Sequence, residues 1–189
     1  MELMQMSVSH QPSQPSASGS VLATIANVLS KIVHASAAIF CWSYVLLIAA
    51  ILLNVTLRYG FSNGLIIFEE IQWHLYAIGM MFGISYAEIT NSQVRVDIIA
   101  DRLRKRTVLT WEIIGSIFFI LPFTFVVIYN AIPYVLSSYM INETSNSPLG
   151  LPFRWAIKAV IPISFIVFVC AVVSRLLNNI DALIKSRED

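Results

Sequence analysis

The side chains that could do chemistry are few, and the richest set lies between positions 68 and 88. At 100° per residue, one narrow helical stripe carries Glu70, His74, Ala77, Met81 and Glu88. Glu70 and His74 lie one turn apart, and ionisable pairs in membrane segments can bind protons or cations. They can equally form a polar couple at the level of the lipid headgroups, bonded to neighbouring helices. Their place near one end of the segment favours this second interpretation.

Small residues occupy another side of the same segment, where Gly79, Gly83 and Ala87 recur every four residues. Such spacing lets a second helix backbone approach closely, which favours helix association in membranes. The pattern fits either packing within the chain or contact with a partner subunit.

Metal, haem and nucleic-acid sites find little support. Both cysteines, Cys41 and Cys170, lie in apolar stretches, whereas a structural zinc site takes about four clustered ligands. Haem held by two histidines needs them to face each other. His34 and His74 are instead expected near opposite sides of the membrane, because the first two segments run in opposite directions. The net charge of +1 argues against nucleic-acid binding. We therefore expect no enzyme activity, no metal and no cofactor.

Four apolar segments must position these residues. Hydrophobic residues make up 57% of the chain and charged residues 12%, against about 25% charged residues in soluble proteins. Each segment is about 20 residues long, enough for a helix to cross ~30 Å of hydrocarbon. The sequence predicts an all-α integral membrane protein with transmembrane helices at about 35–57, 68–88, 111–132 and 157–177, within a membrane domain spanning 35–183.

The flanking segments are expected to lie outside the hydrocarbon. Residues 1–20 are rich in Ser, Gln and Pro and predict a disordered tail, and 184–189 predict a short second tail. Residues 21–34 place Leu22, Ile25, Leu29 and Ile32 on one face, which predicts an amphipathic helix at the membrane surface. A similar pattern from Val96 to Leu103 predicts a second interfacial helix.

The distribution of Lys and Arg predicts the orientation. Nine of the twelve Lys and Arg residues fall on the side of the two termini and of the loop between the second and third segments. Arg58, Arg154 and Lys158 fall on the other side. Cytoplasmic loops carry the excess of Lys and Arg, so both termini are expected in the cytoplasm.

Four different short motifs occur in a definite order along the chain. They are Leu57-Arg58-Tyr59, Glu69-Glu70-Ile71-Gln72-Trp73-His74-Leu75, Gln93-Val94-Arg95-Val96-Asp97 and Gly150-Leu151-Pro152-Phe153-Arg154-Trp155. From about Val33 to Leu183 the sequence resembles the small, DctQ-like membrane subunit of TRAP (tripartite ATP-independent periplasmic) transporters. The Gln-Trp-His and Gly-Leu-Pro-x-Arg-Trp elements look most similar to the mannitol/chloroaromatic-type branch.

The resemblance implies a secondary transporter made of three parts. A periplasmic protein would bind an organic acid or related solute, and a large membrane subunit would carry it across by symport with an ion. The small subunit would brace the large one and help to dock the binding protein. Gln93 replaces the histidine of the family pattern, so hydrogen bonding rather than titration is expected there.

Ten residues stand out as structural or subunit-interface candidates. They are Arg58, Glu70, His74, Gly79, Gly83, Gln93, Arg95, Asp97, Arg154 and Trp155. Arg58 and Glu70 are separated by a short loop at one membrane boundary, which suggests that their side chains pair.

Two other functions remain open: an autonomous small proton-coupled transporter, and a membrane anchor subunit of another complex. The first needs a membrane-embedded carboxylate that protons and cations share. The central turns of the four segments contain no ionisable residue, and Glu70 lies close to one end.

The orientation predicts which positions can be labelled from outside the cell. On a background without Cys41 and Cys170, single cysteines in 61–67 and 142–148 should react with an impermeant thiol reagent in intact cells. Cysteines in 102–106 or at the C-terminus should not. Labelling of position 105 from outside would reverse the orientation.

Overall fold

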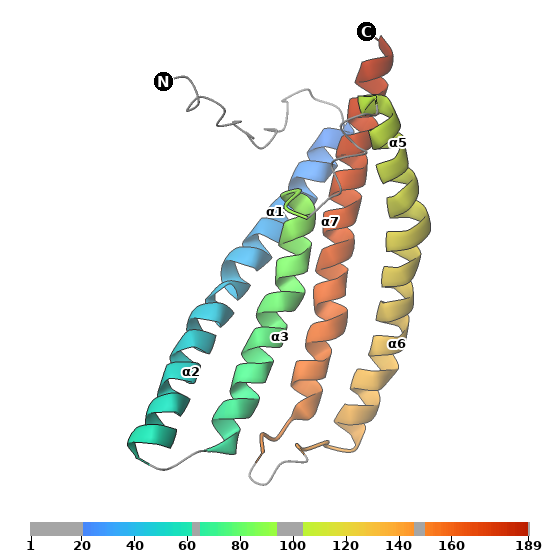
Figure 1. Ribbon diagram of the computed structural model, residues 1–189. Helices are drawn as coiled ribbons and strands as arrows, with labels where there is room; N and C mark the ends of the chain where they lie inside the picture. The colour runs from blue at the N-terminus through green and yellow to red at the C-terminus, as the bar shows by residue number, and fades with distance from the viewer. Residues whose placement is uncertain (1–20, 62–64, 94–103, 146–149, 189) are drawn as a thin grey trace, which may run out of the picture.

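The fold is a set of long helices, seen in a computed structural model that describes residues 21–61, 65–93, 104–145 and 150–188 (Figure 1). The elements are α1 (Val21–Phe40), α2 (Trp42–Gly60), α3 (Ile66–Ile89), α5 (Lys105–Gly115), the π-helical turn η1 (Ser116–Ile120), α6 (Leu121–Met140) and α7 (Arg154–Glu188). No strand occurs among these residues. The predicted tail 1–20 and the whole of the predicted interfacial helix 96–103 lie outside the described residues.

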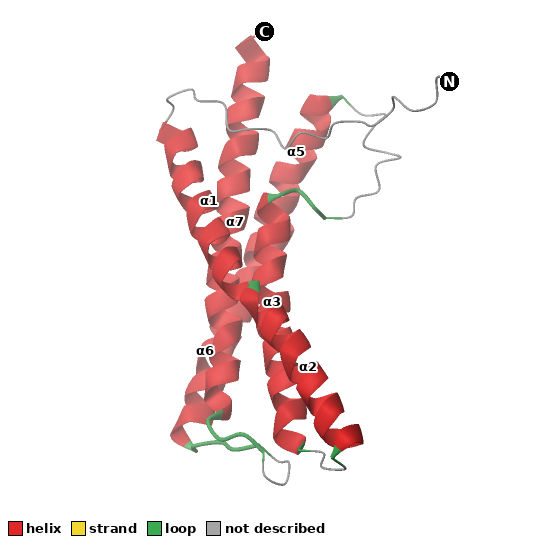
Figure 2. Cartoon of the chain, turned by 90° about the vertical axis from the view of Figure 1, so that its left-hand side faces the viewer, coloured by secondary structure: helices red, strands yellow, loops and turns green. Residues whose placement is uncertain are grey.

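The last helix, α7, is the centre of the arrangement. It packs against α1, α3, α5 and α6, whereas α2 packs against α3. In one half of the molecule α2, α3, α7 and α6 stand side by side, and in the other half α1 and α5 flank α7 (Figure 1). The turned view shows α1 and α2 running obliquely across the other helices (Figure 2). We call the end with the loops α2–α3 and α6–α7 the connection end, and the opposite one the terminal end.

Three helical stretches in the described part are long and apolar enough to cross a membrane. They are Val21–Gly60, Arg106–Met140 and Arg154–Lys185. At 1.5 Å per residue the first is about 60 Å long, so only about half of it fits ~30 Å of hydrocarbon. The third segment predicted from sequence lies within α5–α6 and the fourth within α7, and both helices are longer than hydropathy alone indicated. The second segment forms α3, whose 24 residues include Glu69, Glu70 and Glu88; α3 is not among the three stretches.

Residues 21–34 do not form a separate surface helix in this arrangement. They belong to α1, which continues past a turn at Cys41 into α2. On the predicted apolar face Ile25 and Ile32 are about half exposed, as expected of a side that meets lipid, whereas Ala26 and Val33 on another side are fully buried. The small Ala26 lets α7 come close enough for the Ser174 hydroxyl to donate a hydrogen bond to the Ala26 carbonyl, at 2.8 Å.

The π-helical turn η1 has a local cause in Pro122. A proline inside a helix cannot donate to the carbonyl four residues earlier, and its ring clashes with that carbonyl. One extra residue in the turn shifts the pairing, so the Leu121 amide donates to the carbonyl of Ser116, five residues back. The helix therefore continues from α5 into α6 despite the proline.

Helices α2 and α3 approach most closely at Gly79. A Cβ added there would lie 2.7 Å from the Ser43 hydroxyl and 2.8 Å from the Tyr44 ring. One turn further along, the rings of Phe40 and Phe82 stack with centroids 3.6 Å apart. Gly83 has no atom within 4 Å of such a Cβ. Of the two glycines, Gly79 packs within the chain and Gly83 faces an open side.

The two glycines predict opposite results for the same substitution. Gly79→Ala should destabilise the folded protein, because overpacking costs about 1–3 kcal/mol, more than the helix propensity that alanine gains. Gly83→Ala, the matched control, should be neutral or stabilising by up to about 1 kcal/mol. Unfolding in mixed micelles at increasing denaturing detergent measures both. Equal effects at the two sites would contradict the close approach at Gly79.

Candidate functional site

A group of polar side chains around the buried Glu88 joins three helices near the terminal end. The Arg175 guanidinium of α7 lies 2.9 Å from a Glu88 oxygen of α3 and 3.3 Å from a Glu112 oxygen of α5. Gln93 donates to the other Glu88 oxygen, and the Asn179 amide donates to Glu112 at 2.9 Å. We call these five residues the Arg175 cluster.

Burial makes the Arg175 cluster important for the fold. The side chain of Glu88 is 2% exposed and that of Arg175 is 14% exposed. Charges so far from water need their partners, since an isolated buried charge loses its hydration without compensation. The sequence placed Glu88 on the polar stripe of its helix and Arg175 among the basic flanking residues, but nothing in the sequence showed that they meet.

The connection end has its own network, centred on Glu143. The Glu143 carboxylate accepts hydrogen bonds from Lys158 and from the Ser138 hydroxyl, and Arg154 lies 3.6 Å away. The hydrogen bond from Lys158, followed by that from Ser138, lowers the pKa of Glu143 below its ordinary value. The Arg154 amide also donates to the Glu143 carbonyl at 3.1 Å. This network ties the α6–α7 loop to the start of α7.

Glu70 holds the other side of the α6–α7 loop. Its carboxylate accepts hydrogen bonds from the Leu151 amide, at 2.7 Å, and from the Ser145 hydroxyl. Gly150 lies so close that an added Cβ would be 2.9 Å from a Glu70 oxygen. The same Cβ would lie 2.6 Å from the Ser145 hydroxyl, so a side chain at position 150 would collide within the loop as well as with Glu70, which gives a physical reason for the glycine in Gly-Leu-Pro-x-Arg-Trp.

The expected pairing of Arg58 with Glu70 is wrong. Arg58 lies 3.4 Å from Glu69 instead, and these side chains are 60% and 50% exposed. Glu70, one residue further along α3, is turned toward the α6–α7 loop. Adjacent residues on a helix point about 100° apart. Glu69 faces Arg58 of α2, so its neighbour Glu70 points in another direction, toward the α6–α7 loop.

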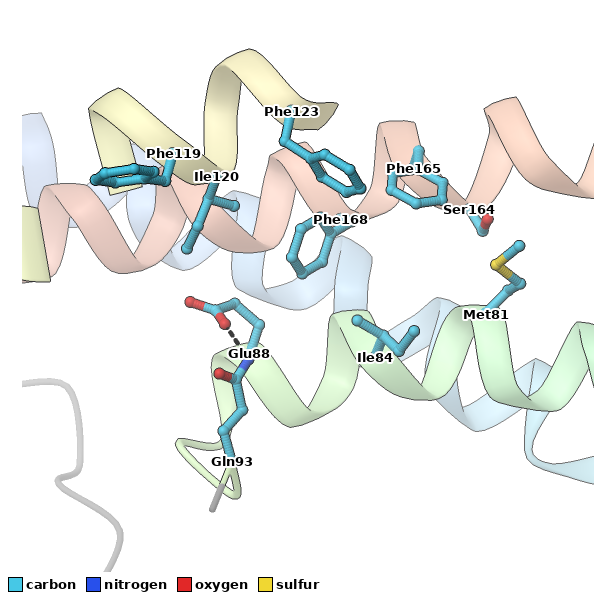
Figure 3. Close-up of a pocket in the computed structure, with 10 residues that line it drawn as sticks. All are labelled: Met81, Ile84, Glu88, Gln93, Phe119, Ile120, Phe123, Ser164, Phe165 and Phe168. Carbon is cyan, nitrogen blue, oxygen red and sulfur yellow. Dashed lines mark hydrogen bonds between the residues drawn. The ribbon is translucent and has the colours of Figure 1, made fainter. Parts of the chain in front are cut away.

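An apolar groove of about 560 Å³ lies between α3 and α6 (Figure 3). Residues of α3, η1, α6 and α7 line it, namely Met81, Ile84, Glu88, Gln93, Phe119, Ile120, Phe123, Ser164, Phe165 and Phe168. Glu88 and Gln93 lie together at one end of the groove. The phenylalanines of η1 and α6 form the wall opposite α3, and those of α7 form the floor (Figure 3). We call this feature the α3–α6 groove.

The remaining candidates fall in separate places. His74 lies two turns before Met81 on the same face of α3 and is partly exposed. The Trp155 ring meets the edge of the Tyr139 ring at 5.4 Å between α7 and α6. Arg95 and Asp97 lie outside the described residues. Among the residues described, no three His, Cys, Asp or Glu side chains are placed to hold a metal ion.

Comparison with known families gives a match over residues 47–182, more than half of the chain. The family is described as "Tripartite ATP-independent periplasmic transporters, DctQ component". The chain belongs to this family. No curated protein and no solved structure matches it.

Membership agrees with the structure and explains parts of the motifs. A DctQ component belongs to a transporter and not to an enzyme family, and the three apolar helical stretches suit a multi-pass protein of the inner membrane. In this DctQ component the Glu of the second segment and the Gly-Leu-Pro-x-Arg-Trp element meet, through Glu70 and Gly150. The motifs therefore hold the connection end together.

Two Arg–Glu pairs that differ in burial predict different costs of mutation. Arg175→Gln should destabilise the protein by about 3–5 kcal/mol, because it strands buried Glu88 without its cation. Arg58→Gln, the matched control at an exposed pair, should cost at most about 1 kcal/mol. Thermal unfolding of purified protein in detergent compares the two. A similar loss for both variants would show that the Arg175 cluster is not the more important contact.

Proposed function

We propose that this chain is the small bracing subunit of a tripartite secondary transporter for an organic acid or related solute. The match to the DctQ family carries the proposal. The placement of charge supports it: the described ion pairs, such as Arg175 with Glu88 and Lys158 with Glu143, connect helices and loops near the ends of the bundle. Such contacts hold a scaffold together, whereas a solute path needs polar groups that are free to bind and release their cargo.

In this proposal α3 is the fourth transmembrane helix. It runs beside α7, which contains an apolar stretch, and beside α2, which is part of another. Most polar residues of α3 are near the ends of the helix. Glu69 and Glu70 fall at the connection end and Glu88 at the other. A helix with polar groups at both ends can span the hydrocarbon when neighbours bond those groups.

The connection end faces the periplasm in this proposal, because most Lys and Arg lie toward the terminal end. It would then meet the soluble binding protein. Glu143 and Glu70 hold the described parts of the α6–α7 loop in place, which favours a fixed surface for docking at this end. The Gln-Trp-His and Gly-Leu-Pro-x-Arg-Trp elements support the mannitol/chloroaromatic-type branch, and Glu70, two residues before Gln72, bonds the second element at Leu151.

Reconstitution tests the proposal against an autonomous transporter. Vesicles with this chain alone should show no uptake of radiolabelled organic acids under a sodium or proton gradient. Vesicles that also contain the large membrane subunit, supplied with the binding protein, should show gradient-dependent uptake. Saturable uptake by the isolated chain, or full uptake by the large subunit and binding protein without this chain, would overturn the bracing function.

A further inference from the structure

Helices α5 and α7 lie side by side at the terminal end (Figure 1). A cavity of about 340 Å³ opens between them, and Arg106, Thr110, Leu183 and Ile184 line it. One wall is polar and comes from the start of α5, whereas the other is apolar and comes from the end of α7. The volume falls within the range of small-ligand sites. We call this cavity the α5–α7 pocket.

The α5–α7 pocket lies where two of the three apolar helical stretches end. The stretch Arg106–Met140 begins at a lining residue, and the stretch Arg154–Lys185 ends one residue after Ile184. Trp111, which is 65% exposed, follows Arg106 on α5, and exposed tryptophans concentrate where hydrocarbon meets headgroups. At 1.5 Å per residue Arg106 is about 7 Å further out, within a headgroup layer of about 5–8 Å on each side. Arg106 therefore lies at the level of the lipid phosphates.

The side chain of Arg106 has no anionic partner in the described part of the chain. It is exposed and forms no hydrogen bond or ion pair with described residues. The basic residues nearby differ: Arg175 lies against two glutamates, and Lys185 bonds Asp181 at 2.7 Å. Lys185 thereby offsets the one carboxylate close in sequence to the apolar wall. Of the described lining residues Arg106 alone is charged, so the α5–α7 pocket favours an anion.

The polar wall matches a phosphate that carries a hydroxylated group. A guanidinium presents five N–H donors and binds phosphate through two parallel hydrogen bonds. The Thr110 hydroxyl donates to the Arg106 carbonyl at 2.9 Å, so its oxygen can still accept a hydrogen bond from a ligand. Toward the middle of the membrane the same side of the helix continues with Ile114 and Ile117, which are 37% and 42% exposed. Charge at the pocket and apolar surface below it fit an amphiphile.

We propose that the α5–α7 pocket binds the headgroup of an anionic phospholipid, with Arg106 bonded to the lipid phosphate. The acyl chains then run along Ile114 and Ile117 into the hydrocarbon. Basic pockets between membrane helices commonly bind anionic headgroups in this way. The pocket lies further out than the contact between Glu112 and Asn179, so a bound lipid ties the first turn of α5 to the end of α7 beyond the Arg175 cluster. This inference needs the membrane but no partner subunit.

Thermal unfolding of the full chain in a neutral detergent, with lipid added, tests the site. Phosphatidylglycerol should raise the Tm, because a ligand that binds only the folded state stabilises it. Phosphatidylcholine, whose headgroup has no net charge, should not. The dependence of the Tm on the amount of phosphatidylglycerol gives the affinity. Arg106→Gln should weaken this affinity about tenfold, as expected for the loss of a charge-assisted hydrogen bond.

Arg104→Gln is the matched control. Arg104 is exposed two residues earlier, its side chain does not cap α5, and it does not line the α5–α7 pocket. Its affinity for phosphatidylglycerol should equal that of the unsubstituted chain. Equal losses for the two arginine variants would mean diffuse attraction to negative charge and would overturn the site, as would an unchanged affinity in Arg106→Gln. An equal rise in Tm with phosphatidylcholine, or with sodium phosphate in place of lipid, would overturn the anionic phospholipid as the ligand.

A substitution on the opposite wall gives an independent readout. Ile184 lines the α5–α7 pocket and is 50% exposed, so a polar side chain there can reach water without unfolding α7. Ile184→Glu should lower the affinity for phosphatidylglycerol because its carboxylate repels the phosphate. Ile184→Gln has nearly the same size without the charge and should retain more of the affinity. Equal affinities for these two variants, each compared with its own Tm in the absence of lipid, would contradict a phosphate in this pocket.

Discussion

A single guanidinium group holds the arrangement of the helices together. Arg175 on α7 reaches Glu88 at the end of α3 and Glu112 on α5. In a membrane the apolar surfaces of helices gain little by leaving lipid, so polar contacts and close backbone packing decide how helices associate. Because α7 is the last helix in the chain, α3 and α5 acquire this common partner only when α7 is in place. These charges then fix the positions of α3 and α5 along α7.

Hydrogen bonds and ion pairs of polar side chains also hold the connection end together. Glu143 and Glu70 hold the α6–α7 loop from two sides, and Gly150 permits the close approach. Between the two ends α2 and α3 meet at the small residue Gly79, and the rings of Phe40 and Phe82 stack. A bundle tied at both ends suits a subunit that stays fixed while another subunit moves. In the proposed transporter such a subunit would brace the large one and present its connection end to the binding protein.

The sequence predicts the positions of the helices better than it predicts which side of each helix is buried. Long apolar runs predict membrane helices because few other structures satisfy the backbone in lipid. In these runs the side of a helix that faces lipid is about as hydrophobic as the side that faces protein. Hydrophobicity therefore did not show which side is buried. In residues 21–34 the apolar pattern marked the side of Ile25 and Ile32, which is about half exposed, and not the buried side of Ala26 and Val33. Arg58 was matched to the wrong carboxylate, because sequence distance cannot distinguish Glu69 from Glu70. The Arg175 cluster joins residues from three distant segments, and a single sequence gives no signal for that meeting.

The central claim is that the α3–α7–α6 arrangement is preformed, so that the chain can act as a brace. Pulsed electron paramagnetic resonance between spin labels at Tyr76 on α3 and Ile132 on α6 measures it, on a background without Cys41 and Cys170. Both positions are about half exposed and lie outside the groove lining. The account predicts one narrow distance distribution, the same for the isolated chain in nanodiscs and for the assembled transporter. A broad distribution in the isolated chain that narrows or shifts on assembly would contradict it.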